Sequence, residues 1–279
     1  MTGVVSVETT SDGLSRTRGL PVDIAFRLRG TGPAVVLLHG TSASHAVWEP
    51  VGDILANHAT VIALDQRGHG RSDKPELGYT GVDFASDIVA VIDALGIKRA
   101  VVAGHSLGGR NAWVTAARHP ERVAGVVVVD YTPFIEAPVI DELESRVTLG
   151  FRHFADVDEI ESYLHNRYPL VPPEAIARRA RWGYEMLADG RWVPLASPVA
   201  MSQLIEGFRT PYDEEFRSVP TPMTHFRGNS SRIVSELAWE KAIAARPDDR
   251  WVTVSGADHY IPEELPDIVA AEILHRLGT

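Results

Sequence analysis

The sequence contains no cysteine. Disulfide bonds, thiolate nucleophiles and zinc sites with cysteine ligands are therefore excluded. Long hydrophobic runs are also missing, since apolar segments such as Val126–Val129 fall far short of the roughly 20 residues that cross a bilayer. The first residues lack a basic stretch followed by an apolar one, which argues against a signal peptide. We therefore expect a cytoplasmic protein without a membrane partner.

Basic residues are scarce relative to acidic ones. Lys and Arg total 27 against 37 Asp and Glu, which gives a formal net charge of −10. Nucleic-acid binding needs basic patches, so a nucleic-acid partner is not expected. The charge says little about small ligands, because a local group of arginines can oppose the global sign. We expect a small-molecule partner, and the sequence leaves homo-oligomerisation open.

Short apolar, β-branched segments alternate with helical patterns along most of the chain, and 44% of its 279 residues are hydrophobic. Continuous apolar runs are typical of strands that are buried on both faces of a parallel sheet. Strands that alternate with helices predict an α/β fold with a mostly parallel, doubly wound sheet. The predicted strands are 34–38, 61–64, 100–103, 123–129, 222–227 and 251–254, and the predicted helices between and after them include 84–95, 107–119 and 265–277.

The alternation stops between residues 134 and 211, where we find no convincing strand. Helical patterns separated by prolines predict a helical cap over the sheet, with helices at 140–154, 157–166 and 174–188. The predicted core then comprises 20–133 and 212–279, and the polar residues 1–19 are expected to be loose.

A G-x-S-x-G motif, Gly104-His105-Ser106-Leu107-Gly108, follows a predicted strand and precedes a predicted helix. In that context the motif predicts a nucleophile elbow, a strained turn in which the flanking glycines avoid Cβ clashes. The turn would present the Ser106 hydroxyl at the carboxyl end of the sheet and at a helix N-terminus, where negative charge is favoured. Ser106 is therefore the candidate nucleophile.

Three motifs in this order resemble the cap-bearing branch of the α/β-hydrolase fold family. They are His39-Gly40, the segment Asp65-Gln66-Arg67-Gly68-His69-Gly70-Arg71-Ser72, and the Ser106 motif. The resemblance extends over nearly the whole chain from about residue 21. It implies a serine hydrolase, since relatives that hydrolyse epoxides or haloalkanes carry Asp at the nucleophile position. It also implies a structural role for the segment with Asp65, His69 and Asp73, so no metal or other cofactor is expected.

The family order of nucleophile, acid and then histidine assigns the base to His259, which follows the last predicted strand. The acid is harder to assign, because the usual family position falls in Arg227-Gly228-Asn229-Ser230-Ser231-Arg232, which has no carboxylate. Asp130, at the end of the preceding strand, is our preferred acid. Asp258, beside His259, is the alternative.

The oxyanion hole needs two backbone N–H donors, and we expect them from Leu107, which follows the nucleophile, and from Thr41, which follows Gly40. Arginine binds carboxylates through two parallel hydrogen bonds. Most arginines of the insertion are expected to be solvated, but Arg146 and Arg167 lie near the inner ends of the first two helical patterns. They are candidate ligands for a small acidic substrate.

The shifted acid is also similar to a narrower group, the cap-bearing amidohydrolases that act on ring-opened products of N-heterocycle breakdown, including vitamin B6 degradation. That resemblance implies cleavage of an amide C–N bond in a small dicarboxylate through an acyl-enzyme. It further implies substrate contacts from His45, Tyr168, Ser230 and Tyr260.

Other reactions remain open on the same residues. A carboxylesterase or a C–C bond hydrolase would use the same triad. Cofactor-free dioxygenases of this fold use the His–Asp pair, and a ligand receptor could retain the triad without turnover.

Overall fold

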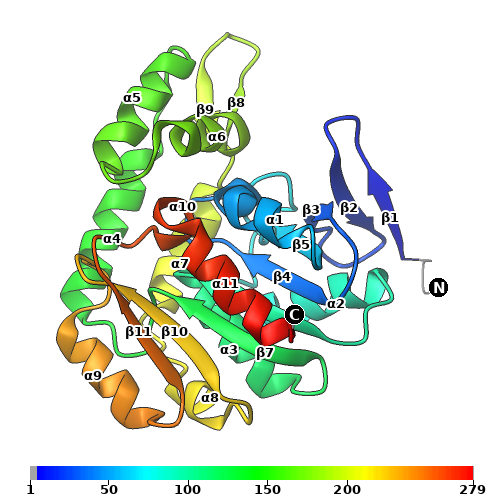
Figure 1. Cartoon of the computed structure of the whole chain (residues 1–279). Helices are drawn as coiled ribbons and strands as arrows, with labels where there is room; N and C mark the ends of the chain where they lie inside the picture. Colours follow the sequence, from blue (N-terminus) through cyan, green and yellow to red (C-terminus); the bar gives the residue numbers. More distant parts are fainter. Residues whose placement is uncertain (1–4, 279) are drawn as a thin grey trace.

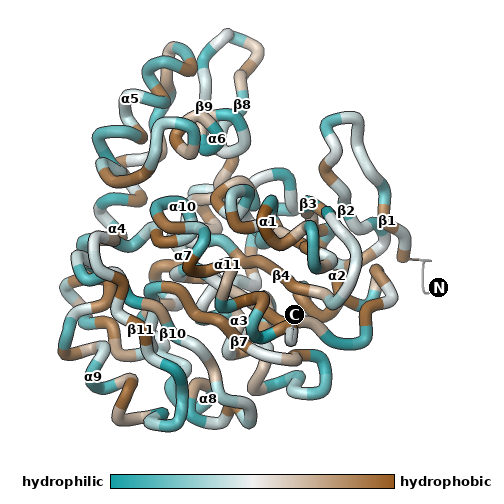
Figure 2. The backbone as a smooth tube through the Cα atoms, in the orientation of Figure 1, coloured by the Kyte–Doolittle hydropathy of each residue, from teal (hydrophilic) through white to brown (hydrophobic). Residues whose placement is uncertain are grey.

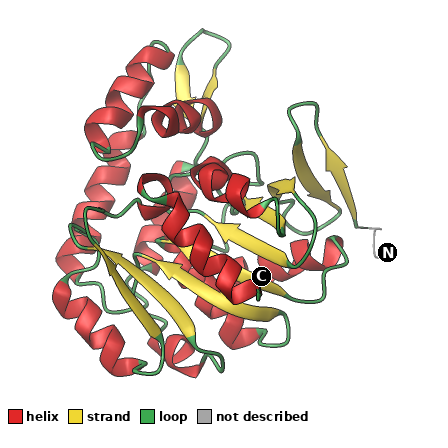
Figure 3. Ribbon diagram, in the orientation of Figure 1, coloured by secondary structure: helices red, strands yellow, loops and turns green. Residues whose placement is uncertain are grey.

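The computed structural model describes residues 5–278, in which nine strands form one sheet (Figures 1 and 3). Continuous apolar runs build its centre, since every residue of β4 and β6 is buried. Six neighbouring strands run parallel to one another, namely β5, β4, β6, β7, β10 and β11. At the β5 edge the sheet continues through β3, β2 and β1, each of which is antiparallel to the strand before it. In spatial order the strands are β1 (Ser6–Thr9), β2 (Leu14–Arg18), β3 (Ala25–Arg29), β5 (Thr60–Leu64), β4 (Ala34–Leu38), β6 (Ala100–His105), β7 (Val123–Val129), β10 (Met223–Gly228) and β11 (Arg250–Val254).

Helices cover both faces of the sheet, as expected for a doubly wound α/β fold. One apolar cluster joins the sheet to α2 (Gly81–Ala94) and α3 (Leu107–Arg118). A second cluster joins the opposite face to α1 (Glu49–Leu55) and α11 (Pro266–Leu277). Figure 2 shows the hydrophobic tube segments concentrated in the central strands. The core also contains the 3-10 helix η1 (His45–Trp48), α8 (Asp213–Ser218), α9 (Glu236–Ala245) and α10 (Ile261–Glu264).

The segment between β7 and β10 is mainly helical. It contains α4 (Ala137–Gly150), α5 (Val157–Arg167), α6 (Pro173–Gly183), a small hairpin of β8 (Tyr184–Met186) and β9 (Trp192–Pro194), and α7 (Pro198–Gly207). Figure 1 shows α5, α6 and the hairpin grouped together, away from the sheet. They share a separate apolar cluster, whereas the buried residues of α7 belong to the cluster of the sheet. The hairpin strands are three residues each, too short for the sequence pattern to reveal.

The prediction of a loose segment over residues 1–19 was wrong for the strands β1 and β2. β1 pairs with β2, and β2 pairs with β3. The hydroxyl of Thr17 accepts a hydrogen bond from the backbone N–H of Ile24 at 2.8 Å, and Arg16 pairs with Asp73. These contacts order a polar segment without a large apolar face. Residues 1–4 lie outside the described part of the chain.

Candidate active site

Ser106 lies on the sharp turn between β6 and α3 and has a φ of 54°. A positive φ is strained for a residue with a side chain. A Cβ on Gly104 would lie 2.0 Å from the carbonyl oxygen of Gly108, and a Cβ on Gly108 would lie 2.2 Å from that of Leu38. Both positions therefore require glycine, and the turn has the geometry of a nucleophile elbow.

Two backbone N–H groups beside Ser106 are free to receive a negative oxygen. Within residues 5–278, neither the N–H of Leu107 nor that of Thr41 donates a hydrogen bond. Leu107 is the first residue of α3, where the helix dipole adds positive potential. Thr41 lines the same cavity as Ser106.

The imidazole of His259 forms a buried pair with the carboxylate of Asp130, with 2.6 Å between Nδ1 and Oδ2. Asp130 follows β7, and His259 follows β11. The alternative acid, Asp258, instead accepts a 2.6 Å hydrogen bond from the backbone N–H of His259 through Oδ1. The ring of His259 thus contacts Asp130, and the main chain of His259 contacts Asp258.

Burial sets the protonation of this pair. It lowers the pKa of His259 to about 3, and the nearby charges of Arg146 and Arg179 act in the same direction. The imidazole is therefore neutral at physiological pH and can accept a proton. Burial raises the pKa of Asp130 to about 7. The hydrogen bonds from Ser231 and Gly228 and the charge of Arg227 act in the opposite direction and lower this pKa.

The residue that supports Asp130 is Ser231, which the sequence analysis did not identify. Its hydroxyl donates to Oδ2 of Asp130 at 2.5 Å, and the backbone N–H of Gly228 donates to Oδ1 at 3.0 Å. Ser230, the predicted substrate contact, is exposed and directs its hydroxyl to Asn229. The prediction was one residue away from the serine that faces the site.

Ser106 and His259 line the same cavity between the sheet and the cap segment. Four of the predicted substrate contacts also line it, namely Arg146, Arg167, Tyr168 and Tyr260.

The arginines of the cavity differ in their partners. Within the described residues, Arg146 makes no side-chain hydrogen bond or ion pair. Arg167 donates to the hydroxyls of Tyr168 and Tyr163 and to the carbonyl of Arg146, and forms no ion pair in the described chain. Arg179 is buried in the cavity wall and pairs with Glu263, so the expectation of a solvated side chain was wrong for Arg179.

Comparisons with known proteins agree with this geometry. The family model described as alpha/beta hydrolase fold matches residues 33–157. The chain is 43% identical over 252 residues to the 2-(acetamidomethylene)succinate hydrolase of Mesorhizobium japonicum, which covers 90% of both chains. The chain belongs to the α/β-hydrolase fold family. The crystal structure of E-2-(acetamidomethylene)succinate hydrolase superposes with a TM-score of 0.90 at 40% identity, over 99% of this chain and all of that one. The thioesterase domain of the curacin biosynthetic pathway shares the fold. It superposes with a TM-score of 0.76 at 22% identity, over 98% of this chain and all of that one.

Two further histidines of this hydrolase lie close to the site without entering the pair. His105 donates from Nε2 to the backbone carbonyl of His259 at 2.8 Å. This hydrogen bond connects the turn of Ser106 to the loop that carries His259. His45 does not line the Ser106 cavity: it is fully buried, and its Nδ1 lies 2.9 Å from Oδ1 of Asp65. The prediction of a substrate contact at His45 was therefore wrong.

Asp65 has a structural role in this hydrolase. Besides His45, it accepts a 2.9 Å hydrogen bond from the backbone N–H of Arg71. Across residues 5–278 no group of three or more His, Asp or Glu side chains is arranged to hold a metal ion. No helix of that range is long and apolar enough to cross a bilayer.

Proposed function

We propose that the hydrolase cleaves the amide C–N bond of a small dicarboxylate of the 2-(acetamidomethylene)succinate type. One observation carries this proposal: the cavity with Ser106 and His259 also contains Arg146 and Arg167, neither of which has a carboxylate partner in the described chain. Unpaired guanidinium groups in a protein of net charge −10 favour an anionic ligand. The similarity to the Mesorhizobium enzyme supports the substrate class.

In this proposal Ser106, His259 and Asp130 form the catalytic triad. Nε2 of His259 takes the proton of the Ser106 hydroxyl while Oγ bonds to the amide carbon. The carbonyl oxygen becomes an oxyanion, which the N–H groups of Thr41 and Leu107 stabilise. Asp130 holds the imidazole in the tautomer with a proton on Nδ1 and stabilises the imidazolium.

The intermediate collapses when His259 returns its proton to the amide nitrogen, and the C–N bond breaks. The amine product leaves, and the acyl group remains as an ester on Ser106. A water molecule, deprotonated by His259, then attacks the ester carbon, and the carboxylic acid leaves with Ser106 restored. For an acetamido substrate the acid released is acetate.

Arg146 and Arg167 are proposed to bind the two carboxylates of the substrate, with Tyr168 and Tyr260 in the same wall. The hydrogen bonds from Arg167 to two tyrosine hydroxyls support this, because they fix the guanidinium before the substrate arrives. A preorganised cation loses little conformational entropy on binding.

A hydrolysis screen tests the proposal. Small N-acetyl amides with two, one or no carboxylates are compared with simple esters on wild type, Ser106→Ala and Arg167→Ala. We expect the dicarboxylate amide to give the highest kcat/KM, Ser106→Ala to lose nearly all turnover, and Arg167→Ala to raise KM at least tenfold for the dicarboxylate alone.

Different outcomes would identify other reactions. Equal or better turnover of uncharged esters would make the protein a carboxylesterase. Retained activity in Ser106→Ala would contradict the acyl-enzyme and favour the dioxygenase alternative. An unchanged KM in Arg167→Ala would contradict the proposed carboxylate site.

A further inference from the structure

The proposed oxyanion donor Thr41 lies on a loop whose backbone has little preference of its own for the observed shape. Gly40 precedes it, and a Cβ there would lie only 3.1 Å from the Cβ of Ser106 and from Nδ1 of His105. Glycine lets the elbow pack close, but it leaves the adjoining peptides free to rotate. Ser42, which follows Thr41, has a strained φ of 60°. Contacts from outside the loop are therefore needed to aim the N–H of Thr41.

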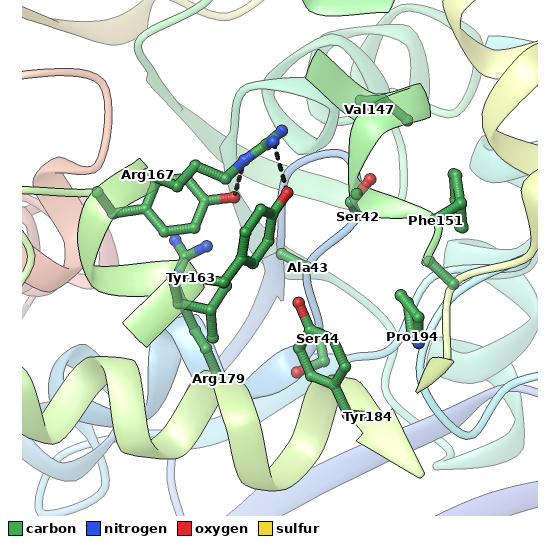
Figure 4. Close-up of a pocket in the computed structure, with 15 residues that line it drawn as sticks. Ser42, Ala43, Ser44, Val147, Phe151, Tyr163, Arg167, Arg179, Tyr184 and Pro194 are labelled. Atoms are coloured by element: carbon green, nitrogen blue, oxygen red, sulfur yellow. Dashed lines mark hydrogen bonds between the residues drawn. The ribbon is translucent and has the colours of Figure 1, made fainter. Parts of the chain in front are cut away.

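Beyond Thr41 the loop borders a cavity beneath the cap. Figure 4 shows Ser42, Ala43 and Ser44 at this cavity, which Tyr163 of the cap also lines. Close packing does not hold a segment on the side where it borders a cavity. The loop is held instead by hydrogen bonds at its first two residues.

His39 orients the peptide that carries the N–H of Thr41. Its Nε2 accepts a 3.0 Å hydrogen bond from the backbone N–H of Gln66. Burial lowers the pKa of His39 to about 4, so the neutral ring carries its proton on Nδ1, which donates to the carbonyl of Gly40 at 2.7 Å. The C=O and N–H of a trans peptide point in opposite directions. The N–H of Thr41 is therefore directed away from the His39 ring.

A second hydrogen bond fixes the preceding peptide. Nε2 of Gln66 donates to the carbonyl of His39 at 2.6 Å. Gln66 thus binds His39 twice, with its backbone N–H on the ring and its side-chain amide on the main chain. It connects the segment after β5 to the segment after β4. Both peptides that flank Gly40 are then held at their carbonyl oxygens.

The side-chain amide of Gln66 is itself oriented by two residues of α3. Nδ2 of Asn111 donates to Oε1 of Gln66 at 2.7 Å, and Nε of Arg110 donates to Oδ1 of Asn111 at 3.2 Å. A guanidinium only donates and a carbonyl oxygen only accepts, so Arg110 at one end and the His39 carbonyl at the other fix the direction of both amides. All four residues are buried.

Arg110 contributes a buried positive charge. Its two terminal nitrogens have no hydrogen-bond partner within residues 5–278, and its Cζ lies 5.1 Å from the ring centre of Phe208 and 5.6 Å from that of Tyr212. A buried cation without a carboxylate partner destabilises a fold, so stability does not explain it. A hydrogen bond from a cation polarises the next bond in a network, so Arg110 strengthens the donors that face the loop.

We propose that Arg110, Asn111 and Gln66 form an amide network that holds the oxyanion hole in its donating geometry, with Gln66 as the positioning residue. The inference rests on the proposed acyl-enzyme at Ser106 and deepens it with residues that do not line the cavity of Ser106. The amide network acts on kcat rather than on KM, because the N–H of Thr41 contributes most when negative charge has developed on the carbonyl oxygen.

Asn111→Asp separates this role from a structural one. The carboxylate gives Arg110 a counter-charge, so the unfolding temperature should not fall. A carboxylate only accepts, so it turns the Gln66 amide around and leaves Oε1 facing the carbonyl of His39. With 2-(acetamidomethylene)succinate as the probe, kcat should fall about tenfold or more at unchanged KM, since the loss of one oxyanion donor lowers kcat about 100-fold or more.

Two glutamine variants form a matched pair. Gln66→Leu removes the hydrogen bond to the His39 carbonyl and should lower kcat in the same way. Gln203→Leu is the control, because it removes a 2.6 Å hydrogen bond from a glutamine Nε2 to the carbonyl of Glu76, outside the cavity of Ser106. It should leave kcat and KM unchanged.

Phenylboronic acid measures the oxyanion hole without turnover, because its boron bonds to the serine oxygen and places an oxygen at the oxyanion position. Its dissociation constant is measured by calorimetry on the full chain. We expect the constant to rise about tenfold or more in Asn111→Asp and Gln66→Leu and to keep the wild-type value in Gln203→Leu.

The outcomes separate this inference from the proposed function. Wild-type kcat and boronic acid affinity in Asn111→Asp would overturn the amide network alone, and so would a higher KM at unchanged kcat. A kcat that falls only together with the unfolding temperature would make the three residues merely structural. If wild type binds phenylboronic acid without cleaving the amide, the proposed substrate is wrong, and the boronic acid affinities still test the amide network. Absence of binding to wild type would contradict Ser106 as the nucleophile, and with it both proposals.

Discussion

At the scale of single residues, the site is defined by a carboxylate that stands on a different strand from the usual one. Asp130 follows β7, and the loop after β10 supplies hydrogen-bond donors, Ser231 and the N–H of Gly228, in place of an acid. Two donors on the carboxylate favour its ionised form and oppose the effect of burial. In the proposed triad, the segment at the end of β10 would thus favour the charged form of Asp130.

This arrangement makes the pH profile of kcat/KM depend on Ser231. The proposed mechanism needs an ionised Asp130, and the hydrogen bond from Ser231 lowers the pKa of Asp130. Ser231→Ala removes that bond, so the pKa of Asp130 rises and the acidic limb of kcat/KM moves to higher pH. Activity above that limb should change little.

Ser230→Ala is the control for this prediction, because the exposed neighbour makes its hydrogen bond to Asn229 at 3.4 Å. Its acidic limb should coincide with that of wild type. A Ser231→Ala profile that superposes on wild type would show that Ser231 only shapes the loop.

At the scale of helices and strands, the sequence predicted the strands that consist of continuous apolar runs. The runs at β4 and β7 were predicted at the residues where the structure has them, because strands buried on both faces leave an unambiguous pattern. β1 and β2 were missed, because their polar sequences are ordered by pairing with β3 and by contacts such as Arg16 with Asp73. Pairing between distant segments leaves no local signal.

For Arg179 the helical spacing indicated a buried side chain, but the charge led to the prediction of an exposed one. It lies on α6 beside the buried Ala175, Ile176 and Ala180, three or four positions away along the helix or adjacent, so helical spacing places it on the buried face. Its charge suggested solvent instead. The partner that makes burial tolerable, Glu263 on α10, is 84 positions away in sequence, so the sequence alone could not identify it.

The Arg179–Glu263 pair joins the cap to the loop of His259, and we expect its loss to destabilise the protein. Both side chains are nearly inaccessible, at 9% and 2% exposure. Glu263→Gln leaves a buried guanidinium without a counter-charge, which costs about 3 to 5 kcal/mol. Urea unfolding followed by circular dichroism measures the change in the free energy of unfolding.

Two further variants test whether charge is the cause. Arg179→Met with Glu263→Gln should recover most of the loss, because no isolated charge then remains buried. Glu215→Gln breaks the more exposed pair with Arg118 and should cost less than about 1 kcal/mol. If the double variant were as unstable as Glu263→Gln alone, the buried charge would not be the cause.

At the scale of the whole molecule, the apolar core is divided. Two large clusters cover the faces of the sheet, while α5, α6 and the β8–β9 hairpin share a small cluster of their own. The cavity of Ser106 lies where the cap meets the sheet, since Arg167 and Tyr168 of its wall belong to the cap and Ser106 belongs to the core. A site at such a boundary can be opened by motion of the smaller unit while Ser106, Asp130 and His259 stay on the larger one.

This division predicts that the cap opens at a lower free energy than the sheet. Regions with few buried apolar contacts exchange amide hydrogens through local opening. Hydrogen exchange followed by mass spectrometry should therefore show faster exchange in α5 than in α7. The two helices form a matched pair, with 11 and 10 residues, and each begins with a side-chain cap, from Asp156 and Ser197. They differ in their packing, because the buried residues of α7 belong to the sheet cluster.

A boronic acid bound at Ser106 should slow exchange in α5 and leave α7 unchanged, since the ligand contacts both cap and core and stabilises the closed state. Equal exchange in the two helices would mean that cap and sheet open as one unit, and access to Ser106 would then have to come from loop motion alone.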